Sequence, residues 1–169
     1  MRLSTRGRYA VMAMADLAAR QSVGCECGPV CLAEIAASQK LSLPYLEQLF
    51  ARLRRSGLVA SARGPGGGYR LARDSDQISI AAIIDAVDEP IRATRCDGAT
   101  SSCLALPGQV PGQVPGQVTE RCQTHDLWSE LGRQIGLFLD AVSLADVVLG
   151  RVKGRAVPPI PGLVHAAAE

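Results

Sequence analysis

The sequence predicts a mainly α-helical protein with one small β-hairpin, and two patterns support this fold class. Apolar residues recur every three or four positions in several separate segments, which is the period of an amphipathic helix. A Gly/Pro-rich loop at residues 63–68 separates two short strand-like runs, as in a β-hairpin. A chain of 169 residues can hold one compact domain with an appendage.

Composition excludes two broad classes of protein. The apolar fraction is 47% and the charged fraction 20%, values that are ordinary for a globular protein and argue against intrinsic disorder. No apolar run reaches the length of about 18 residues that a membrane-spanning helix needs, so we expect no membrane partner. Residues 1–8 lack the apolar core of a signal peptide, and we therefore expect a cytoplasmic chain.

The first helix is expected to be capped by Ser4 or Thr5 and to run through Ala19. A break at residues 24–29 follows, because Gly and Pro interrupt the helical pattern there. The predicted apolar stripe of this helix consists of Tyr9, Met12, Ala13 and Leu17.

Two short helices follow, and their spacing indicates a helix-turn-helix. The first is expected over residues 32–38 and the second over residues 43–56, with a turn at residues 39–41 between them. Ser42 can cap the second helix, and Gly57 ends it in the manner usual for helix C-termini.

The next segment is expected to form the wing of a winged helix. Residues 58–62 and 69–71 read as two strands joined by the Gly/Pro loop, whose four glycines let its backbone approach another surface closely. Residues 1–75 are therefore predicted to form a winged helix-turn-helix DNA-binding domain, with the helix-turn-helix at about 32–55 and the wing at 58–71.

The charge distribution is consistent with a polyanion-binding N-terminal half. Residues 1–73 carry 11 basic and 4 acidic side chains, whereas residues 74–169 carry 7 basic and 12 acidic ones. Of the 18 basic residues 16 are Arg, the side chain suited to bidentate contacts with phosphate and guanine. We expect double-stranded DNA as the partner of the basic half.

The C-terminal half is expected to contain further helices and one long loop. Ser79 can cap a helix at residues 80–87, and a long amphipathic helix is expected over residues 125–142 with one more turn at 143–148. Too little chain follows the long helix to cover its apolar stripe, which suggests packing against a second subunit. Three Pro-Gly-Gln-Val repeats at residues 107–118 are interpreted as a passive surface spacer.

Candidate DNA contacts lie on the third helix and in the wing. Glu47 can accept a hydrogen bond from cytosine N4, and Gln48 can pair with adenine. Arginines farther along, Arg52 among them, can hold phosphates. A solvated helix whose charges touch nothing is the alternative, but the adjacent wing favours DNA contact. The candidate DNA-binding residues are Tyr45, Glu47, Gln48, Arg52, Arg63, Gly64 and Gly66.

Candidate metal ligands are Cys96, Cys103, Cys122 and His125. Thiolate and imidazole groups bind both zinc and iron–sulfur clusters. Cys122 and His125 lie three positions apart, so a helical start would place both on one face. Spacing alone does not choose among a structural zinc, a cluster and free thiols.

No catalytic arrangement is predicted, so we do not expect an enzyme. The chain has two histidines, His125 and His165, and neither is accompanied by a recognisable nucleophile–base pattern. The remaining cysteines, Cys25, Cys27 and Cys31, are interpreted as free surface thiols.

Several stretches of this chain resemble a family of winged-helix transcription factors that sense iron–sulfur clusters or redox state. The resemblance extends from Met1 to about Val152. Its most specific stretches are residues 2–11 (RLSTRGRYAV), 45–50 (YLEQLF), 63–69 (RGPGGGY), 86–89 (AVDE), 93–96 (ATRC) and 122–128 (CQTHDLW).

This resemblance implies a homodimer with one [2Fe–2S] cluster per subunit, received from the iron–sulfur assembly machinery. It implies repression of the assembly genes when the cluster is present. Residues 76–150 would then form the cluster-binding loop and the dimerisation helices, and residues 151–169 a flexible tail. The ligands carried over are Cys96, Cys103, Cys122 and His125, and the DNA contacts include Tyr45, Glu47, Gln48 and Arg63.

The chain departs from this family pattern in its ligand loop, where 18 residues separate Cys103 from Cys122. Lengthening a flexible loop about threefold costs roughly 1 kcal/mol, which metal–thiolate ligation exceeds. The rival functions are a related regulator that responds to nitric oxide or iron with a different cluster, and a zinc-stabilised protein–protein adaptor.

Overall fold

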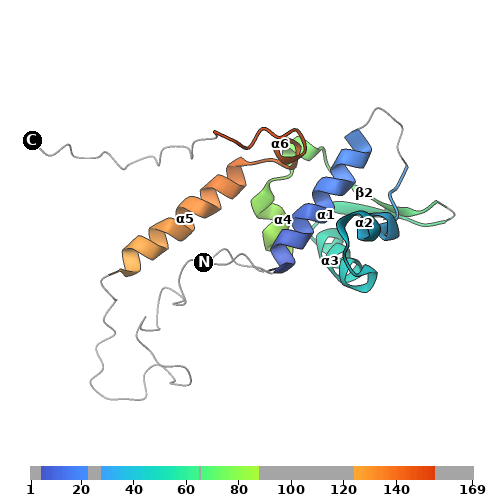
Figure 1. Cartoon of the computed structure of the whole chain (residues 1–169), viewed down its shortest axis with the longest axis horizontal. Coiled ribbons are helices and arrows are strands. Elements are labelled where there is room, and N and C mark those ends of the chain that lie inside the picture. Colours follow the sequence, from blue (N-terminus) through green and yellow to red (C-terminus); the bar gives the residue numbers. More distant parts are fainter. Residues whose placement is uncertain (1–4, 23–27, 65, 88–123, 155–169) are drawn as a thin grey trace, which may run out of the picture.

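The computed structural model describes residues 5–22, 28–64, 66–87 and 124–154, which are mainly helical with one two-stranded antiparallel sheet, as predicted (Figure 1). The elements are α1 (Thr5–Ser22), α2 (Leu32–Gln39), α3 (Leu43–Arg55), β1 (Val59–Ala62), β2 (Gly68–Leu71), the short 3-10 helix η1 (Ser75–Gln77), α4 (Ile80–Ala86), α5 (His125–Ala141) and α6 (Leu144–Val148).

Helix α1 is longer than predicted, and its buried face includes Ala13 and Leu17 of the predicted stripe. It ends at Ser22 rather than Ala19, and Arg20 in its last turn pairs with Asp16 one turn earlier, an interaction that supports the additional residues. Met12 of the predicted stripe is only half-buried. The buried face consists of Ala10, Ala13, Met14, Leu17 and Ala18.

The helix-turn-helix forms as predicted, with small changes at its ends. Helix α2 ends at Gln39, and Lys40 then adopts a left-handed conformation (φ 53°) in which its N–H donates to the carbonyl of Ala36. Ser42 occupies the N-cap position of α3, but its side chain makes no capping hydrogen bond. Gly57 follows α3 with φ 68°, the left-handed geometry that glycine adopts without strain.

The wing is a short hairpin directly after α3. Strands β1 and β2 pair in antiparallel register, with Val59 opposite Leu71 and Ala62 opposite Gly68. The loop between them needs glycine, because Gly64 and Gly66 both have positive φ (111° and 79°). The predicted hairpin is therefore confirmed.

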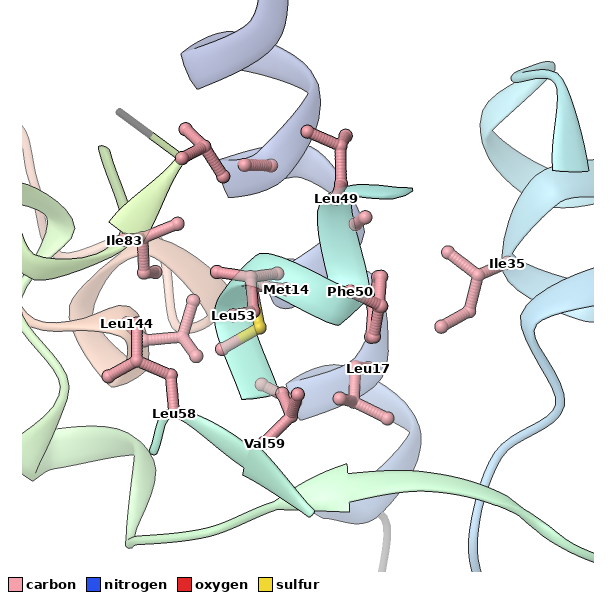
Figure 2. Close-up of a cluster of buried hydrophobic side chains, with 14 of the residues drawn as sticks. Met14, Leu17, Ile35, Leu49, Phe50, Leu53, Leu58, Val59, Ile83 and Leu144 are labelled. Carbon is pink, nitrogen blue, oxygen red and sulfur yellow. The ribbon is translucent and has the colours of Figure 1, made fainter. Parts of the chain in front are cut away.

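One apolar core holds the helix-turn-helix and the wing together. The inward face of α3, formed by Leu46, Leu49, Phe50 and Leu53, is at most 2% exposed. Figure 2 shows that side chains from α1, α2, β1, α4 and α6 converge on the same cluster. Burial of each such side chain stabilises the fold by about 1.5–3 kcal/mol, so this core fixes the orientation of α3.

The C-terminal helices are joined to the core by backbone hydrogen bonds at one point. The N–H of Ile80 donates to Val142 (2.9 Å), and the N–H of Leu144 donates to Ile78 (2.8 Å). Both helices that begin here are capped: Ser79 accepts from the backbone of α4, and Ser143 forms a capping box in α6. The end of α5 is therefore attached to the start of α4.

Helix α5 extends away from α1, α2 and α3 (Figure 1). Three large apolar side chains in its first half remain exposed: Leu127 by 62%, Trp128 by 45% and Leu131 by 38%. Toward its C-terminal end, Phe138 and Leu139 pack against the core. None of the helices in the described ranges is both long and apolar enough to span a bilayer.

Candidate nucleic-acid interface

The outward face of α3 presents two of the predicted base-reading side chains. Glu47 and Gln48 are exposed, whereas Leu46 and Leu49 on either side of them in the sequence are buried. Helical geometry causes this division, because residues three or four apart share a face and their neighbours point elsewhere. The carboxylate and the amide therefore lie next to each other on the surface of the second helix of the helix-turn-helix.

Two other predicted contacts on α3 lie closer to the core than Glu47 and Gln48. Tyr45 is half-buried, and its ring meets that of Tyr9 of α1 edge-on, with centroids 6.1 Å apart and planes at 86°. Arg52 is also half-buried. The packing of Tyr45 on α1 braces the N-terminal end of α3.

The wing loop presents the remaining predicted contacts. Arg63, Gly64 and Gly66 are all exposed. The N–H of Gly67 donates to the carbonyl of Gly64 (2.8 Å), which closes the loop into a tight turn. A Cβ added at Gly64 or Gly66 would meet no atom within 4 Å, so the outer side of this loop is open to an approaching surface.

The structure adds further arginines to this basic region. Arg54 and Arg55 at the end of α3 are exposed, and the guanidinium of Arg54 donates to the hydroxyl of Ser61 in β1 (3.4 Å). Arg70 of β2 is exposed as well, and the sequence reasoning did not select it. Its only signal in the sequence is the alternation of a polar residue with Tyr69 and Leu71 along a strand.

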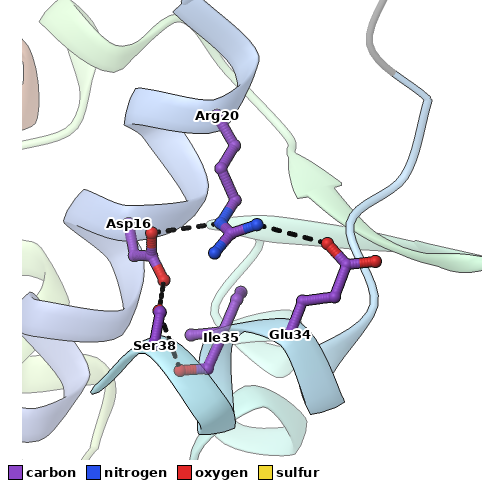
Figure 3. A network of polar contacts seen from close by, with 5 residues as sticks. All are labelled: Asp16, Arg20, Glu34, Ile35 and Ser38. Carbon is purple, nitrogen blue, oxygen red and sulfur yellow. Dashed lines mark hydrogen bonds and ion pairs between the residues drawn. The ribbon is translucent and has the colours of Figure 1, made fainter.

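A polar network on another side of the domain joins α1 to α2 (Figure 3). The guanidinium of Arg20 donates to Asp16 (3.1 Å) and to Glu34 (3.2 Å), and the hydroxyl of Ser38 donates to Asp16. These contacts link the first helix of the helix-turn-helix to α1. No pattern in the sequence indicates this network, because it requires the two helices to be packed together.

The predicted metal ligands fall largely outside the described residues. Cys96, Cys103 and Cys122 lie in the range 88–123, and for His125 only its position as the first residue of α5 is described. The described residues contain no group of three His, Cys, Asp or Glu side chains that could hold a metal ion. Cys31, the described member of the N-terminal cysteines, is an exposed free thiol.

One ion pair on α5 shifts the pKa values of its partners. Hydrogen bonds from Arg133 (2.6 and 2.8 Å) and from Gln134 (2.7 Å) lower the pKa of Glu130 from 4.5 to about 2. The same interaction raises the pKa of Arg133. These three side chains stay charged or polar over the physiological range and mark the solvated face of α5.

A helix-turn-helix followed by a hairpin wing, with a polar face on the second helix and a basic periphery, defines a winged helix-turn-helix DNA-binding protein. Comparison with known proteins agrees with this class. Residues 3–149 match the family model of Rrf2, described as an iron-dependent transcriptional regulator. The chain belongs to the Rrf2 family of transcriptional regulators, and its relatives are regulators rather than enzymes.

Individual relatives support this membership. The chain is 51% identical over 148 residues to the HTH-type transcriptional regulator IscR of Sodalis glossinidius, an alignment covering 88% of this chain and 79% of that protein. It is 48% identical, with the same coverage, to IscR of Serratia proteamaculans.

Two solved structures are also similar. The structure of IscR from T. potens has a TM-score of 0.63 at 36% identity and covers 89% of this chain and 88% of that one. The structure of CymR, the global cysteine regulator of B. subtilis, has a TM-score of 0.65 at 31% identity and covers 89% of this chain and 98% of that one.

Proposed function

We propose that this chain is a cluster-sensing transcription regulator that binds operator DNA as a homodimer and represses iron–sulfur assembly genes when it holds a [2Fe–2S] cluster. The observation that carries the proposal is the pairing of exposed Glu47 and Gln48 on α3 with an exposed Arg63 in the adjacent wing. A helix that reads base edges, beside a loop that can approach the DNA backbone, is an arrangement by which proteins bind duplex DNA.

Each part of this surface has a distinct role in the proposal. Gln48 and Glu47 read base edges in the major groove, Gln48 as a partner of adenine and Glu47 as an acceptor from cytosine. Arg63 reaches the DNA from the wing, where Gly64 and Gly66 allow close approach. Tyr45 and Arg52, nearer the core, support the ends of this contact surface.

The cluster would be held by Cys96, Cys103, Cys122 and His125. The donor set fits the group, since three thiolates and one imidazole supply the four protein ligands that a [2Fe–2S] cluster needs. When bound, the cluster supplies a redox- and iron-dependent signal. His125 is the first residue of α5, and the other end of that helix is hydrogen-bonded to α4. We propose that ligation at one end of α5 is thereby coupled to the DNA-binding domain.

Domain organisation follows from the same proposal. Residues 1–75 bind DNA, residues 76–150 contain the cluster loop and the dimerisation helices, and residues 151–169 form a tail. The exposed apolar side chains of α5, Leu127, Trp128 and Leu131, support dimerisation through this helix. A two-fold dimer would place its recognition helices about one turn of DNA apart, ~34 Å.

DNA recognition can be tested with a duplex that the protein itself selects from a random-sequence library. Replacing Gln48 or Arg63 with Ala should weaken binding to this duplex by about 1–3 kcal/mol each. Matched controls are Gln77→Ala in η1 and Arg151→Ala after α6, both exposed and outside α3 and the wing. Equal effects in control and test variants would contradict the assigned surface.

Cluster binding can be tested by the visible absorbance and iron content of anaerobically purified protein. Replacing Cys96, Cys103 or Cys122 with Ala should remove the absorbance and leave the helical circular dichroism unchanged, whereas Cys31→Ala, an exposed thiol outside the ligand set, should retain both. A colourless native protein that contains zinc would overturn the cluster proposal and favour the zinc-stabilised adaptor.

A further inference from the structure

Tyr69 of β2 connects the wing to the segment that precedes α2. The N–H of Tyr69 donates to the carbonyl of Val30 (2.8 Å), and the N–H of Val30 donates to the carbonyl of Tyr69 (2.8 Å). On its other side Tyr69 pairs with Ser61 of β1. Strand β2 therefore lies between the other strand of the wing and the segment that leads directly into α2.

The residue before Tyr69 makes this close approach possible. A Cβ on Gly68 would lie 2.2 Å from the carbonyl oxygen of Val30 and 3.0 Å from the backbone nitrogen of Cys31. Any other side chain would push the two backbones apart. A Cβ on Gly67 would instead lie 2.6 Å from the carbonyl oxygen of Ala62, within the wing itself, so Gly68 is the wing glycine whose missing Cβ lets the segment before α2 approach.

The side chain of Tyr69 connects the wing to the recognition helix itself. Its ring meets the ring of Phe50 edge-on, with centroids 5.0 Å apart and planes at 68°. Phe50 belongs to α3 and is fully buried, and the exposed Gln48 is two residues earlier on the same helix. One residue thus contacts α3, the start of α2 and both strands of the wing.

We propose that Tyr69 is a positioning residue that holds the wing in a fixed orientation to α3, so that Arg63 and Gln48 engage DNA as one rigid unit. The effect on DNA binding rests on the proposed function. The fixed orientation of the wing relative to α3 is a property of the free protein. In this proposal the ring of Tyr69 and the bridge to Val30 set the angle of the wing to the helix, in addition to the burial of Val59 and the hydrogen bond from the N–H of Leu71 to Gln21.

Two substitutions at Tyr69 separate positioning from general stability. Tyr69→Leu removes the aromatic contact with Phe50 and keeps an apolar side chain, whereas Tyr69→Phe keeps the ring and is the matched control. Hydrogen exchange of the free protein is the first measurement. In Tyr69→Leu the amide of Val30 should exchange at least about tenfold faster, while amides of Leu49 and Leu53 in α3 retain their native rates. Tyr69→Phe should behave as the native chain.

DNA binding to the self-selected duplex is the second measurement. In the native and Tyr69→Phe backgrounds Arg63→Ala should reduce affinity by about fivefold or more. In the Tyr69→Leu background the same substitution should reduce affinity less than about twofold, because the wing is no longer held in place. Binding to random-sequence duplex at low salt should be equal in all backgrounds.

The outcomes are distinguishable. If Arg63→Ala has the same effect in all three backgrounds, or if Val30 exchange is unchanged in Tyr69→Leu, Tyr69 does not position the wing and the inference is overturned. If the native chain binds no duplex, the proposed function fails. The exchange rate of the Val30 amide still decides whether Tyr69 holds the wing in a fixed orientation to α3.

Discussion

The DNA-binding region and α5 use their apolar residues in opposite ways. Helix α3 buries its apolar face except for Leu43 at its first position, which is 37% exposed, and Phe50 and Leu53 are fully inaccessible. Helix α5 packs only partly buried side chains near its C-terminal end against the core and leaves Leu127, Trp128 and Leu131 exposed. The first region packs its core within one subunit, whereas the second presents an apolar surface, which supports the proposed dimerisation through α5.

The difference arises from how each helix is attached to the rest of the chain. Helix α3 is enclosed by α1, α2, β1 and α4, which lie on several sides of it (Figure 2). Helix α5 packs against α4, near the point where Val142 and Leu144 bond to the start of α4. An amphipathic helix held at one end cannot bury its whole apolar stripe without a partner.

The two phenylalanines of the chain allow the sharpest contrast between the regions. Phe50→Ala should destabilise the protein by about 3–5 kcal/mol, because it opens a cavity in a fully buried site. Phe138→Ala in α5 should cost clearly less, since that side chain is only half-buried. Chemical denaturation of both variants measures the difference. Equal losses would show that α5 is as integral to the subunit core as α3.

A charge on the exposed face of α5 should separate the proposed dimer without unfolding the subunit. Leu131→Asp places an unpaired carboxylate in the interface and should weaken association by about 3 kcal/mol or more. Ser129→Asp, also exposed on α5, is the matched control. Sedimentation and the fluorescence of Trp128, the only tryptophan, report the change. A dimer that persists in Leu131→Asp places the interface elsewhere.

Helix capping gives a smaller effect at the junction between the two regions. Ser143→Ala removes the two hydrogen bonds of the Ser143 hydroxyl with Asp146, keeps the one from its backbone N–H to the Asp146 carboxylate, and should cost about 0.5–2 kcal/mol. Ser42→Ala should cost less, because Ser42 holds the N-cap position of α3 without a side-chain hydrogen bond. Thermal unfolding compares the two. A larger loss for Ser42→Ala would contradict the observed caps.

The smallest of these effects is expected on acidification, which should weaken the stabilisation of α5 by Glu130. The folded pKa of Glu130 lies near 2, below its ordinary 4.5, so its stabilisation of α5 is present above pH 4.5 and is lost as the pH falls toward 2. The NMR titration of its carboxyl carbon should show a midpoint well below 4.5, and Arg133→Gln should raise this midpoint toward 4.5, with the hydrogen bond from Gln134 still lowering it. An unshifted native midpoint would mean that the pair does not persist in solution.

Local sequence signals predicted the elements of the DNA-binding domain closely. Apolar spacing gave α2 and α3 to within one residue at their ends, and glycines gave the wing turn. The same signals selected Glu47, Gln48 and Arg63, which the structure places on the exposed surface. The ligand set and its cofactor stay predictions, since Cys96, Cys103 and Cys122 lie outside the described residues.

The sequence by itself determined which segments become helices and where they stop, because caps, glycine conformations and apolar periods act over a few residues. Only the tertiary structure decided that α1 buries Met14 rather than Met12 and that the segment before α2 pairs with β2 at Tyr69. It also decided that Leu127, Trp128 and Leu131 in the first half of α5 are not packed against the core formed by the described residues. These outcomes depend on contacts between residues distant in sequence, which packing selects and local propensity does not encode.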